Sequence, residues 1–347
     1  MGDKVTLKIN SNVYEGWRAF SISKSIETIA SSFRLSVTDN WGEKPWPLTP
    51  GDACEVYIDD EQLVSGYIDA VDNALSSDEL TIQVSGRDKT ADLVDCSVDG
   101  QGSQFTGLKF EKLCSILCKP FGITVESEVN TGAVIPSVVV GVGDTIFETL
   151  DKRARQKGLL LVVGKNGVLK ITTPGKTYAA SALLQGINVL TCNVGLDTKD
   201  RFSTYKVKAQ NGFEENGTGG FETLGRATDA NIARYRPLVI NGESAMSSAD
   251  ATKRAQYEAI TRAARAQTVS ISVVGFKQAN GELWRENQLV LVDVPAVGIY
   301  RQELIISDIA YALDDTGEIT TFGLKRKDAF IPAPEVPEKE EISLGDE

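Results

Sequence analysis

The chain has 347 residues, of which 41% are hydrophobic and 24% are charged, and this balance is typical of folded domains. Its length predicts two to four domains rather than one ordinary core. The net charge of -12 argues against a protein that holds nucleic acid, because such proteins gather lysine and arginine to neutralise phosphates.

Histidine is absent, which excludes Ser-His-Asp and Cys-His catalysis and any zinc site that needs an imidazole. The five cysteines are an odd, scattered set at positions 54, 96, 114, 118 and 192, so we expect free thiols rather than a disulfide framework. No stretch resembles a signal peptide or approaches the roughly 20 apolar residues of a membrane helix, so we expect synthesis in the cytoplasm.

The first ninety or so residues have the alternating apolar pattern of half-buried strands. The segments VTLKIN, SFRLSVTD and ELTIQVSG place an apolar residue at every second position. Two further strands, CEVYID and LVSGYIDAV, flank a turn at 59–62, and Pro45, Pro47, Pro50 and Gly51 mark a longer turn before them. Five or six short antiparallel strands in this length predict a small β-barrel.

Residues 98–190 change to a mixed pattern that predicts a compact α/β unit. We expect a first helix from a Thr106 cap to about Lys119, stopped by Pro120, with its buried stripe at Leu108, Leu113, Ile116 and Leu117.

A second helix in this unit is expected between a Thr145–Glu148 capping box and Gly158, with a buried face formed by Ile146, Leu150 and Ala154. Two apolar strands then flank Lys165-Asn166-Gly167, whose Asn-Gly pair predicts a tight hairpin.

Strands return in RFSTYKVKAQ, break at the glycine-rich NGFEENGTGG and resume after a long helix. Ser247 or Ser248 is expected to cap that helix, and Ala251, Ala255, Ile260 and Ala263 are expected to pack. The later strands lie in TVSISVVGF, ENQLVLVDV, RQELIISDIAYAL and GEITTFGLKRKD, and the Pro- and Glu-rich end predicts a flexible acidic tail.

A faint internal repeat links the two strand-rich regions. The segment YIDAVDNALSSDELTIQVSGRDKTADL is similar to ISDIAYALDDTGEITTFGLKRKDAFI, in that each reads as strand, short turn, strand and charged cluster. Either a true duplication or a coincidence between two hairpins explains this pattern.

Two motifs invite a chemical interpretation, but for both of them an ordinary structural role is favoured. Gly175-Lys176-Thr177 has the end of a phosphate-binding loop, but Lys170 stands where that loop needs its first glycine. Cys114 and Cys118 share a helix face, but no histidine or second cysteine pair completes a metal site.

Carboxylate pairs leave glycoside hydrolysis open, since that reaction needs only two acids. Asp59-Asp60 and Asp314-Asp315 lie in predicted turns, where acids are common without a catalytic reason. Trp17, Trp41 and Trp46 are candidates for a sugar platform, although three tryptophans in a small barrel more often pack in its core and rim. The sequence therefore predicts no catalytic, cofactor-binding or metal-binding residue.

The charged stretch Val84–Cys96, VSGRDKTADLVDC, predicts a strand-to-helix corner that closes the barrel. Gly86 permits a sharp turn, Asp88 or Thr90 caps a short helix, and the charges are expected on the outside.

Five blocks carry a family resemblance: GRDKTADLVDC, LCKPFGITV, FETLDKRARQKGLLLVVGKNGVLKIT, RFSTYKVKAQ and ATDANIARYRPLVI. In this order and spacing they resemble the baseplate hub proteins of Mu-like contractile-tailed bacteriophages. The resemblance implies a mixed α+β, mainly β fold with two similar small antiparallel β-barrel domains of the tube type. It places the first barrel at 1–97, the α/β domain at 98–190, the second barrel at 191–210 and 268–331, an inserted loop and long helix at 211–267, and the acidic tail at 332–347.

The resemblance also implies a structural function without catalysis. We expect a homotrimeric ring in the virion, assembled in the host cytoplasm, that joins the sixfold tail tube or distal tail protein to the threefold membrane-piercing spike and contacts other baseplate proteins. DNA would pass through its centre without specific binding, along an acidic or neutral lining. Two alternatives are a tail-associated cell-wall hydrolase and the hub part of a secretion-system spike.

Overall fold

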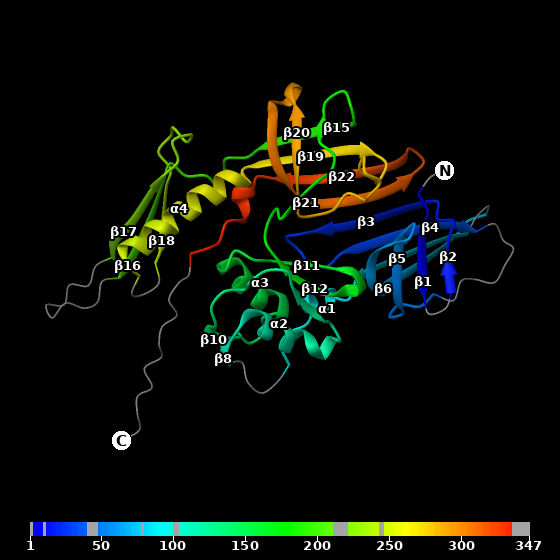
Figure 1. The fold of residues 1–347 in the computed structure, drawn as a ribbon, viewed down its shortest axis with the longest axis horizontal. Helices are drawn as coiled ribbons and strands as arrows, with labels where there is room; N and C mark the ends of the chain where they lie inside the picture. Colours follow the sequence, from blue (N-terminus) through cyan, green and yellow to red (C-terminus); the bar gives the residue numbers. More distant parts are fainter. Residues whose placement is uncertain are drawn as a thin grey trace, which may run out of the picture. The chain divides into compact units, whose positions relative to one another are not determined.

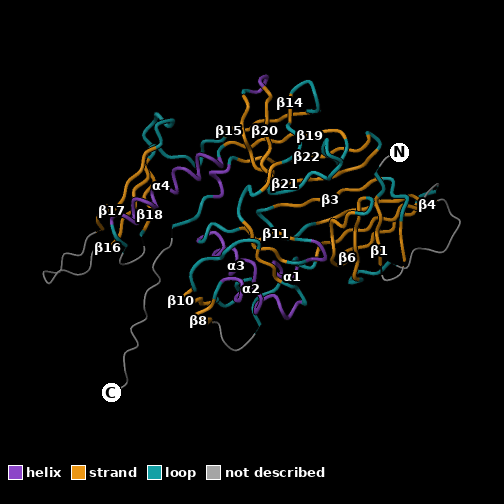
Figure 2. The backbone as a smooth tube through the Cα atoms, viewed as in Figure 1, coloured by secondary structure: helices purple, strands orange, loops and turns teal. Residues whose placement is uncertain are grey.

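The computed structural model describes residues 3–9, 12–39, 48–77, 80–99, 104–210, 221–242 and 246–334. Strands make up most of its regular structure (Figures 1 and 2), which confirms the expected mainly β, mixed α+β class. The chain divides into two compact units. The first comprises Met1–Ala154, Leu159–Val194 and Thr268–Lys325, and the second comprises Arg155–Gly158, Gly195–Gln267 and Arg326–Glu347.

The N-terminal strands form one part of a long sheet in the first unit, with neighbours in the order β3-β4-β7-β6-β5-β1-β2. Alternating apolar residues produce this arrangement, since β7 buries every second residue from Ile82 onward. The strands are β1 (Val5–Ile9), β2 (Asn12–Tyr14), β3 (Ala19–Ser25), β4 (Ser32–Asp39), β5 (Ala53–Ile58), β6 (Glu61–Leu75) and β7 (Leu80–Asp88).

C-terminal strands continue the same sheet in the order β15-β19-β22-β21, with β20 beside β21 and the short parallel β13 and β14 beside β20. These strands are β13 (Thr177–Tyr178), β14 (Leu183–Leu184), β15 (Thr191–Leu196), β19 (Gln267–Val274), β20 (Gln288–Val294), β21 (Ile299–Asp314) and β22 (Gly317–Lys325), with a 3-10 turn η3 at Pro295–Val297. One hydrophobic core serves both parts of the sheet, and it includes Leu7, Leu35, Ile271 and Phe322.

A second core lies in the α/β part of the chain, where Leu113, Leu150 and Ile171 are fully buried. Its β8 pairs with β10, and β12 lies between β11 and β9. The elements are α1 (Ala91–Asp95), β8 (Gln104–Leu108), α2 (Phe110–Cys118), η1 (Lys119–Phe121), β9 (Val125–Ser127), β10 (Ile135–Val139), α3 (Ile146–Gln156), β11 (Leu160–Val163), η2 (Lys165–Gly167) and β12 (Leu169–Thr172).

The second compact unit contains a three-stranded sheet in the order β17-β16-β18 with one long helix against it. Ala251, Ala255 and Ala259 pack the helix against Tyr205 and Val207 of the sheet. The elements are β16 (Thr204–Gln210), β17 (Phe221–Thr228), β18 (Pro237–Asn241), α4 (Ser248–Arg265) and η4 (Lys327–Phe330). Within the described ranges, no helix has the length and apolar character needed to cross a membrane.

Several local predictions are confirmed by hydrogen bonds. Thr145 and Glu148 form the reciprocal capping box, with distances of 3.0 and 3.2 Å, and Ser247 accepts the backbone N–H of Asp250 at 3.1 Å. Asn166 and Gly167 both have positive φ, 59° and 71°, as the predicted hairpin turn requires.

The predicted start of the first helix is wrong. Thr106 lies in β8, opposite Ser137 of β10, and α2 begins only at Phe110. Sheet pairing of Gln104–Leu108 therefore overrides the local capping signal.

The prediction that Ile116 and Ile260 are packed is also wrong, because their side chains are 37% and 46% exposed. The predicted Leu113 and Leu117 are buried in α2 together with Phe110, Cys114 and Cys118. In α4 the buried face consists of small residues: Ala251, Ala255, Ala259, Thr261 and Ala264.

The domain division remains a prediction, with one finding that bears on it. The RFSTYKVKAQ strand, expected in the second barrel, is β16 of the three-stranded sheet, while β15 joins the long sheet. The loop at 211–220 and the tail from residue 335 lie outside the described residues, and closure of the barrels remains a prediction.

Candidate functional site

The long sheet repeats one hairpin. In the N-terminal part the pairing of β6 with β7 skips one residue between Ile68 and Ala70, and in the C-terminal part the pairing of β21 with β22 skips one between Ile306 and Asp308. Each skip is a β-bulge, which bends the long strand. After the bulges the pairing resumes at Ala70 in β6 and at Asp308 in β21, and it then continues without further shifts. Leu75 and Leu313 stand at the same distance from these two residues and are therefore equivalent.

The neighbours of the two hairpins follow the same plan. β6 and β7 have β5 and β4 as outer neighbours, and β21 and β22 have β20 and β19. Gly51 and Asn287 precede β5 and β20 with φ of 94° and 64°, and their N–H groups donate to the carbonyls of Ile68 and Ile306 at 2.8 Å in both cases. The faint sequence repeat thus coincides with a repeated arrangement of strands. We call β3–β7 the N-module, and β15 with β19–β22 the C-module.

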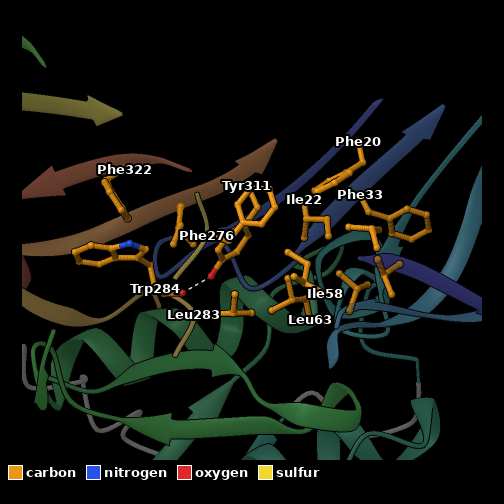
Figure 3. Close-up of a cluster of buried hydrophobic side chains, with 14 of the residues drawn as sticks. Phe20, Ile22, Phe33, Ile58, Leu63, Phe276, Leu283, Trp284, Tyr311 and Phe322 are labelled. Atoms are coloured by element: carbon orange, nitrogen blue, oxygen red, sulfur yellow. Dashed lines mark hydrogen bonds between the residues drawn. The ribbon is translucent and has the colours of Figure 1, made fainter. Parts of the chain in front are cut away.

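The two modules join where β3 pairs antiparallel with β21, and we call this pairing the internal seam. Ile22 lies opposite Tyr311 and Phe20 opposite Leu313. Ile22 and Tyr311 are fully buried, and Figure 3 shows them among the aromatic side chains of the shared core. Phe276 contacts both Phe20 and Tyr311, with ring centroids 5.6 and 5.9 Å away. Burial raises the pKa of the Tyr311 phenol, whose hydroxyl donates to the Trp284 carbonyl.

One buried ion pair lies at the internal seam. The ammonium of Lys24 on β3 is 2.8 Å from the carboxylate of Glu286, and the two side chains are only 8% and 11% exposed. Burial by itself would raise the pKa of Glu286, but the Lys24 charge outweighs it and holds that pKa below its usual range. Nothing in the sequence pattern marked either residue, since Lys24 stands in an alternating strand and Glu286 in a loop.

The charged corner after β7 is built around a buried carboxylate. Asp88 is 1% exposed and accepts the backbone N–H groups of Ser31 and Thr90 at 2.6 and 2.9 Å. Burial raises the pKa of Asp88, and the hydrogen bonds from Thr90 and Ser31 oppose that rise. Thr90 in turn donates its hydroxyl to the Ile29 carbonyl at 2.9 Å. The prediction that these charges lie outside is therefore wrong for Asp88, because backbone donors compensate its burial.

Glycines allow the two strands to approach closely at this corner. A Cβ at Gly66 would lie 1.9 Å from the Arg87 carbonyl oxygen, and one at Gly86 would lie 2.2 Å from that of Tyr67. Gly86 is therefore required for close backbone packing, and its φ is not in the left-handed region.

The remaining charges of the corner lie on the outside, as predicted. Arg87 bridges Asp69 and Asp95, with nitrogen–oxygen distances of 2.8 Å to each. The hydrogen bonds that Arg87 donates to Asp95 and Asp69 raise the pKa of Arg87, and the same contact lowers the pKa of Asp95. All three side chains are at least 36% exposed, so the network contributes little to stability.

The sequence motifs that suggested chemistry have structural partners. Gly175 donates its N–H to Asn287 at 2.8 Å, and Lys176 pairs with Glu128 at 3.3 Å. Cys114 and Cys118 are buried in α2, where burial raises the pKa of Cys118 to about 12. Among the described residues no three His, Cys, Asp or Glu side chains are grouped to hold a metal ion.

The carboxylate pairs do not converge on a common site. Asp59 pairs with Lys277 at 2.6 Å, and Asp314 accepts the Thr316 N–H at 2.7 Å within its own turn. Trp17 is 7% exposed and belongs to the core, while Trp41 and Trp46 lie outside the described residues.

Comparison with protein families accounts for most of the chain. Residues 4–88 match the N-terminal domain of Mu phage baseplate assembly protein GpP-like proteins, and residues 247–333 match the fourth domain of Mu phage baseplate assembly protein GpP. Residues 90–173 match the second domain of baseplate hub protein gp44-like proteins. The baseplate hub protein gp44 of Escherichia phage Mu is 32% identical over 341 residues, which cover 95% of this chain and 90% of that protein. The chain belongs to the Mu-like phage baseplate hub family.

Solved structures agree with this assignment. The 43 kDa tail protein of prophage MuSo2 from Shewanella oneidensis has a TM-score of 0.85 at 32% identity, covering 95% of the hub chain and 100% of that protein. An Escherichia coli component of the type VI secretion system, described as similar to T4 tail proteins gp27 and gp5, shares the fold with a TM-score of 0.59. That likeness, at 10% identity over 96% of the hub chain and 80% of the other, concerns the fold alone. The protein is thus a phage tail baseplate component and part of the virion.

Proposed function

We propose that three copies of the hub chain form a ring that joins a sixfold tail tube to a threefold membrane-piercing spike. The repeated module carries this proposal: each chain presents the same strand order, bulge and left-handed residue twice. Three copies would therefore offer six near-equivalent modules to a sixfold partner while keeping threefold symmetry toward the spike. Three copies of a chain with a single module would offer a sixfold partner only three such modules.

The proposed domain division follows the same logic. Residues 1–97 supply the first tube-type domain, and β15 with 268–331 supplies the second, while β16, which was expected in the second barrel at 191–210, belongs to the three-stranded sheet. Residues 98–190 form the α/β domain, and 211–267 are the insertion. The tail tube or distal tail protein, the central spike and other baseplate proteins are its partners, and assembly takes place in the host cytoplasm.

We propose that DNA passes through the ring without specific binding. The long sheet supports this with the face opposite its core, which carries mostly neutral polar side chains: Ser21, Ser23, Ser36, Gln83, Ser85, Ser270, Ser272 and Thr321. Arg34 is an exposed cation on the same face, opposite Ser21 and Ser85. A surface with few cations offers phosphates few strong contacts. We expect this face to line the passage, with a neutral rather than strongly acidic character.

The ring is tested by measuring the mass of the purified full chain in solution and imaging it by electron microscopy. We expect a particle of three chain masses with a central opening. A chain that stays monomeric at high concentration, or a trimer without an opening, would contradict the proposal.

We propose no catalytic function. The competing hydrolase hypothesis is tested by incubating the full chain with peptidoglycan, where we expect no release of soluble fragments. Release that disappears when one carboxylate is replaced would establish the hydrolase instead.

A further inference from the structure

The repeat leaves one open strand edge in each module. Beyond its bulge, β21 has β22 on one side and β3 on the other. The equivalent part of β6 has β7 on one side, and in the described part of the chain no strand pairs with its other side. At the end of the sheet β15 has only β19 as neighbour, whereas β3 has both β4 and β21.

The equivalence of β15 and β3 extends to individual residues. Leu190 donates its N–H to the Ser272 carbonyl at 2.8 Å, just as Arg18 donates to Ser36 at 2.9 Å. Ser272 and Ser36 are themselves equivalent, because they lie opposite Thr321 and Gln83 at the same distance from the bulges. Counting onward makes Cys192, Val194 and Leu196 equivalent to Phe20, Ile22 and Lys24, in that order.

Apolar side chains are exposed at the two open edges. Leu196 is 76% exposed, whereas its equivalent Lys24 is 8% exposed in the internal seam. Leu75 is 66% exposed, whereas its equivalent Leu313 is partly buried against the core. The difference at each position is the presence of a neighbouring strand, so each open edge exposes a large apolar side chain that an adjacent strand would cover.

We propose that β15 of one copy adds to the free edge of β6 in a second copy, in the antiparallel register of the internal seam. Cys192 then lies opposite Leu75 of the second copy, Val194 opposite Asn73 and Leu196 opposite Val71. This inference rests on the proposed trimer and defines its contact. The contact joins different surfaces of the two copies, so it continues from copy to copy until the ring closes.

The distribution of charges at the two edges favours β15 of a second copy as the strand that pairs with β6. Pro50 precedes Gly51 as Glu286 precedes Asn287, so the internal pair Lys24–Glu286 becomes the apolar pair Leu196–Pro50 between copies. The exchanged pairings are disfavoured, because β15 on β21 would leave Glu286 buried without its cation, and β3 on β6 would leave Lys24 without its anion. Each strand therefore fits only one of the two edges.

Disulfide trapping in the full chain tests the register. Facing residues on antiparallel strands have Cα atoms about 4.5–5.5 Å apart, within the range of a disulfide. In a Cys96→Ser background, Leu75→Cys places a thiol opposite native Cys192 of the next copy. On mild oxidation we expect this variant to form covalent dimers and trimers. They should be at least tenfold more abundant than in two controls: the variant that combines Leu75→Cys with Cys192→Ser, and the variant Asn73→Cys, in which the new thiol does not face Cys192.

A charge exchange tests the same contact without cysteine. Leu196→Lys should weaken self-association at least tenfold, and adding Pro50→Glu should restore it by recreating the internal ion pair between copies. A trimer that forms no Leu75→Cys cross-link, or in which Pro50→Glu restores nothing, overturns the strand pairing and leaves the ring intact. A protein that is monomeric at every concentration overturns the ring and the pairing together.

Discussion

The buried ion pair of the internal seam gives the sharpest test of how the modules are held together. At an effective dielectric of about 20, opposite charges 2.8 Å apart attract by about 6 kcal/mol. Removing two such groups from water costs several kcal/mol for each ion, so the pair as a whole adds close to nothing. Lys24→Met leaves the Glu286 carboxylate buried without a partner, and we expect it to lower the free energy of unfolding by about 3–5 kcal/mol.

The matched control replaces both charges. Lys24→Met with Glu286→Met keeps the volume and removes the uncompensated charge, so we expect it to recover most of the loss. Arg285 is the nearby cation that could substitute for Lys24, but it pairs with Glu61.

The pH dependence of Lys24→Met has a predictable sign. In the native chain the pKa of Glu286 is lowered. The ionised Glu286 carboxylate therefore contributes to the free energy of unfolding at neutral pH, and this contribution is lost as the pH falls through the lowered pKa. Without Lys24, burial raises the pKa of Glu286, so protonation relieves the penalty as pH falls. The stability difference between native and Lys24→Met chains should therefore narrow on acidification.

Guanidinium unfolding followed by tryptophan fluorescence measures the native chain and both variants, because Trp284 is buried in the shared core. A double variant as unstable as Lys24→Met, or a difference that widens at low pH, would refute the reasoning and assign the loss to packing of the lysine stem.

Three further predictions concern the corner after β7, each measured by the same unfolding assay. Gly86→Ala should cost about 3 kcal/mol, because its Cβ would lie 2.2 Å from the Tyr67 carbonyl oxygen, and the neighbouring Ser85→Ala should be nearly neutral. Equal midpoints for the two variants would contradict the close approach. Asp88→Ala should cost about 3 kcal/mol, because it leaves the N–H groups of Ser31 and Thr90 without their acceptor, and a neutral outcome would show that other groups replace it. Arg87→Ala should cost less than about 1 kcal/mol because its ion pairs are exposed, and a larger loss would mean that the bridge between Asp69 and Asp95 fixes the corner.

The features that could be predicted from the sequence are those that depend only on residues a few positions apart. The Thr145–Glu148 capping box, the Ser247 cap and the Asn166-Gly167 turn each depend on hydrogen bonds or dihedral angles of neighbouring residues, and all three are present. Alternation of apolar residues likewise located the strands of both modules.

Features that depend on distant partners were not visible. Thr106 has a capping side chain, but Ser137 across the sheet decides its conformation. Asp88 resembles its charged neighbours, yet the N–H of Ser31, which is 57 residues away, makes its burial acceptable. Lys24 and Glu286 are 262 positions apart and look like ordinary surface charges until β3 and β21 pair.

The internal seam also has a consequence for biosynthesis. The strand that flanks β3 is made long after it, since Ser25 pairs with Asp308 across 283 positions. A ribosome that has translated three hundred codons has released every strand of the N-module, yet the edge of β3 still lacks its neighbour. Contacts so far apart in sequence form slowly, and an uncovered edge invites aggregation in the meantime. We therefore expect nascent chains to need shielding until β21 has been made, and we expect termination before β21 to yield an aggregation-prone fragment rather than a smaller working part.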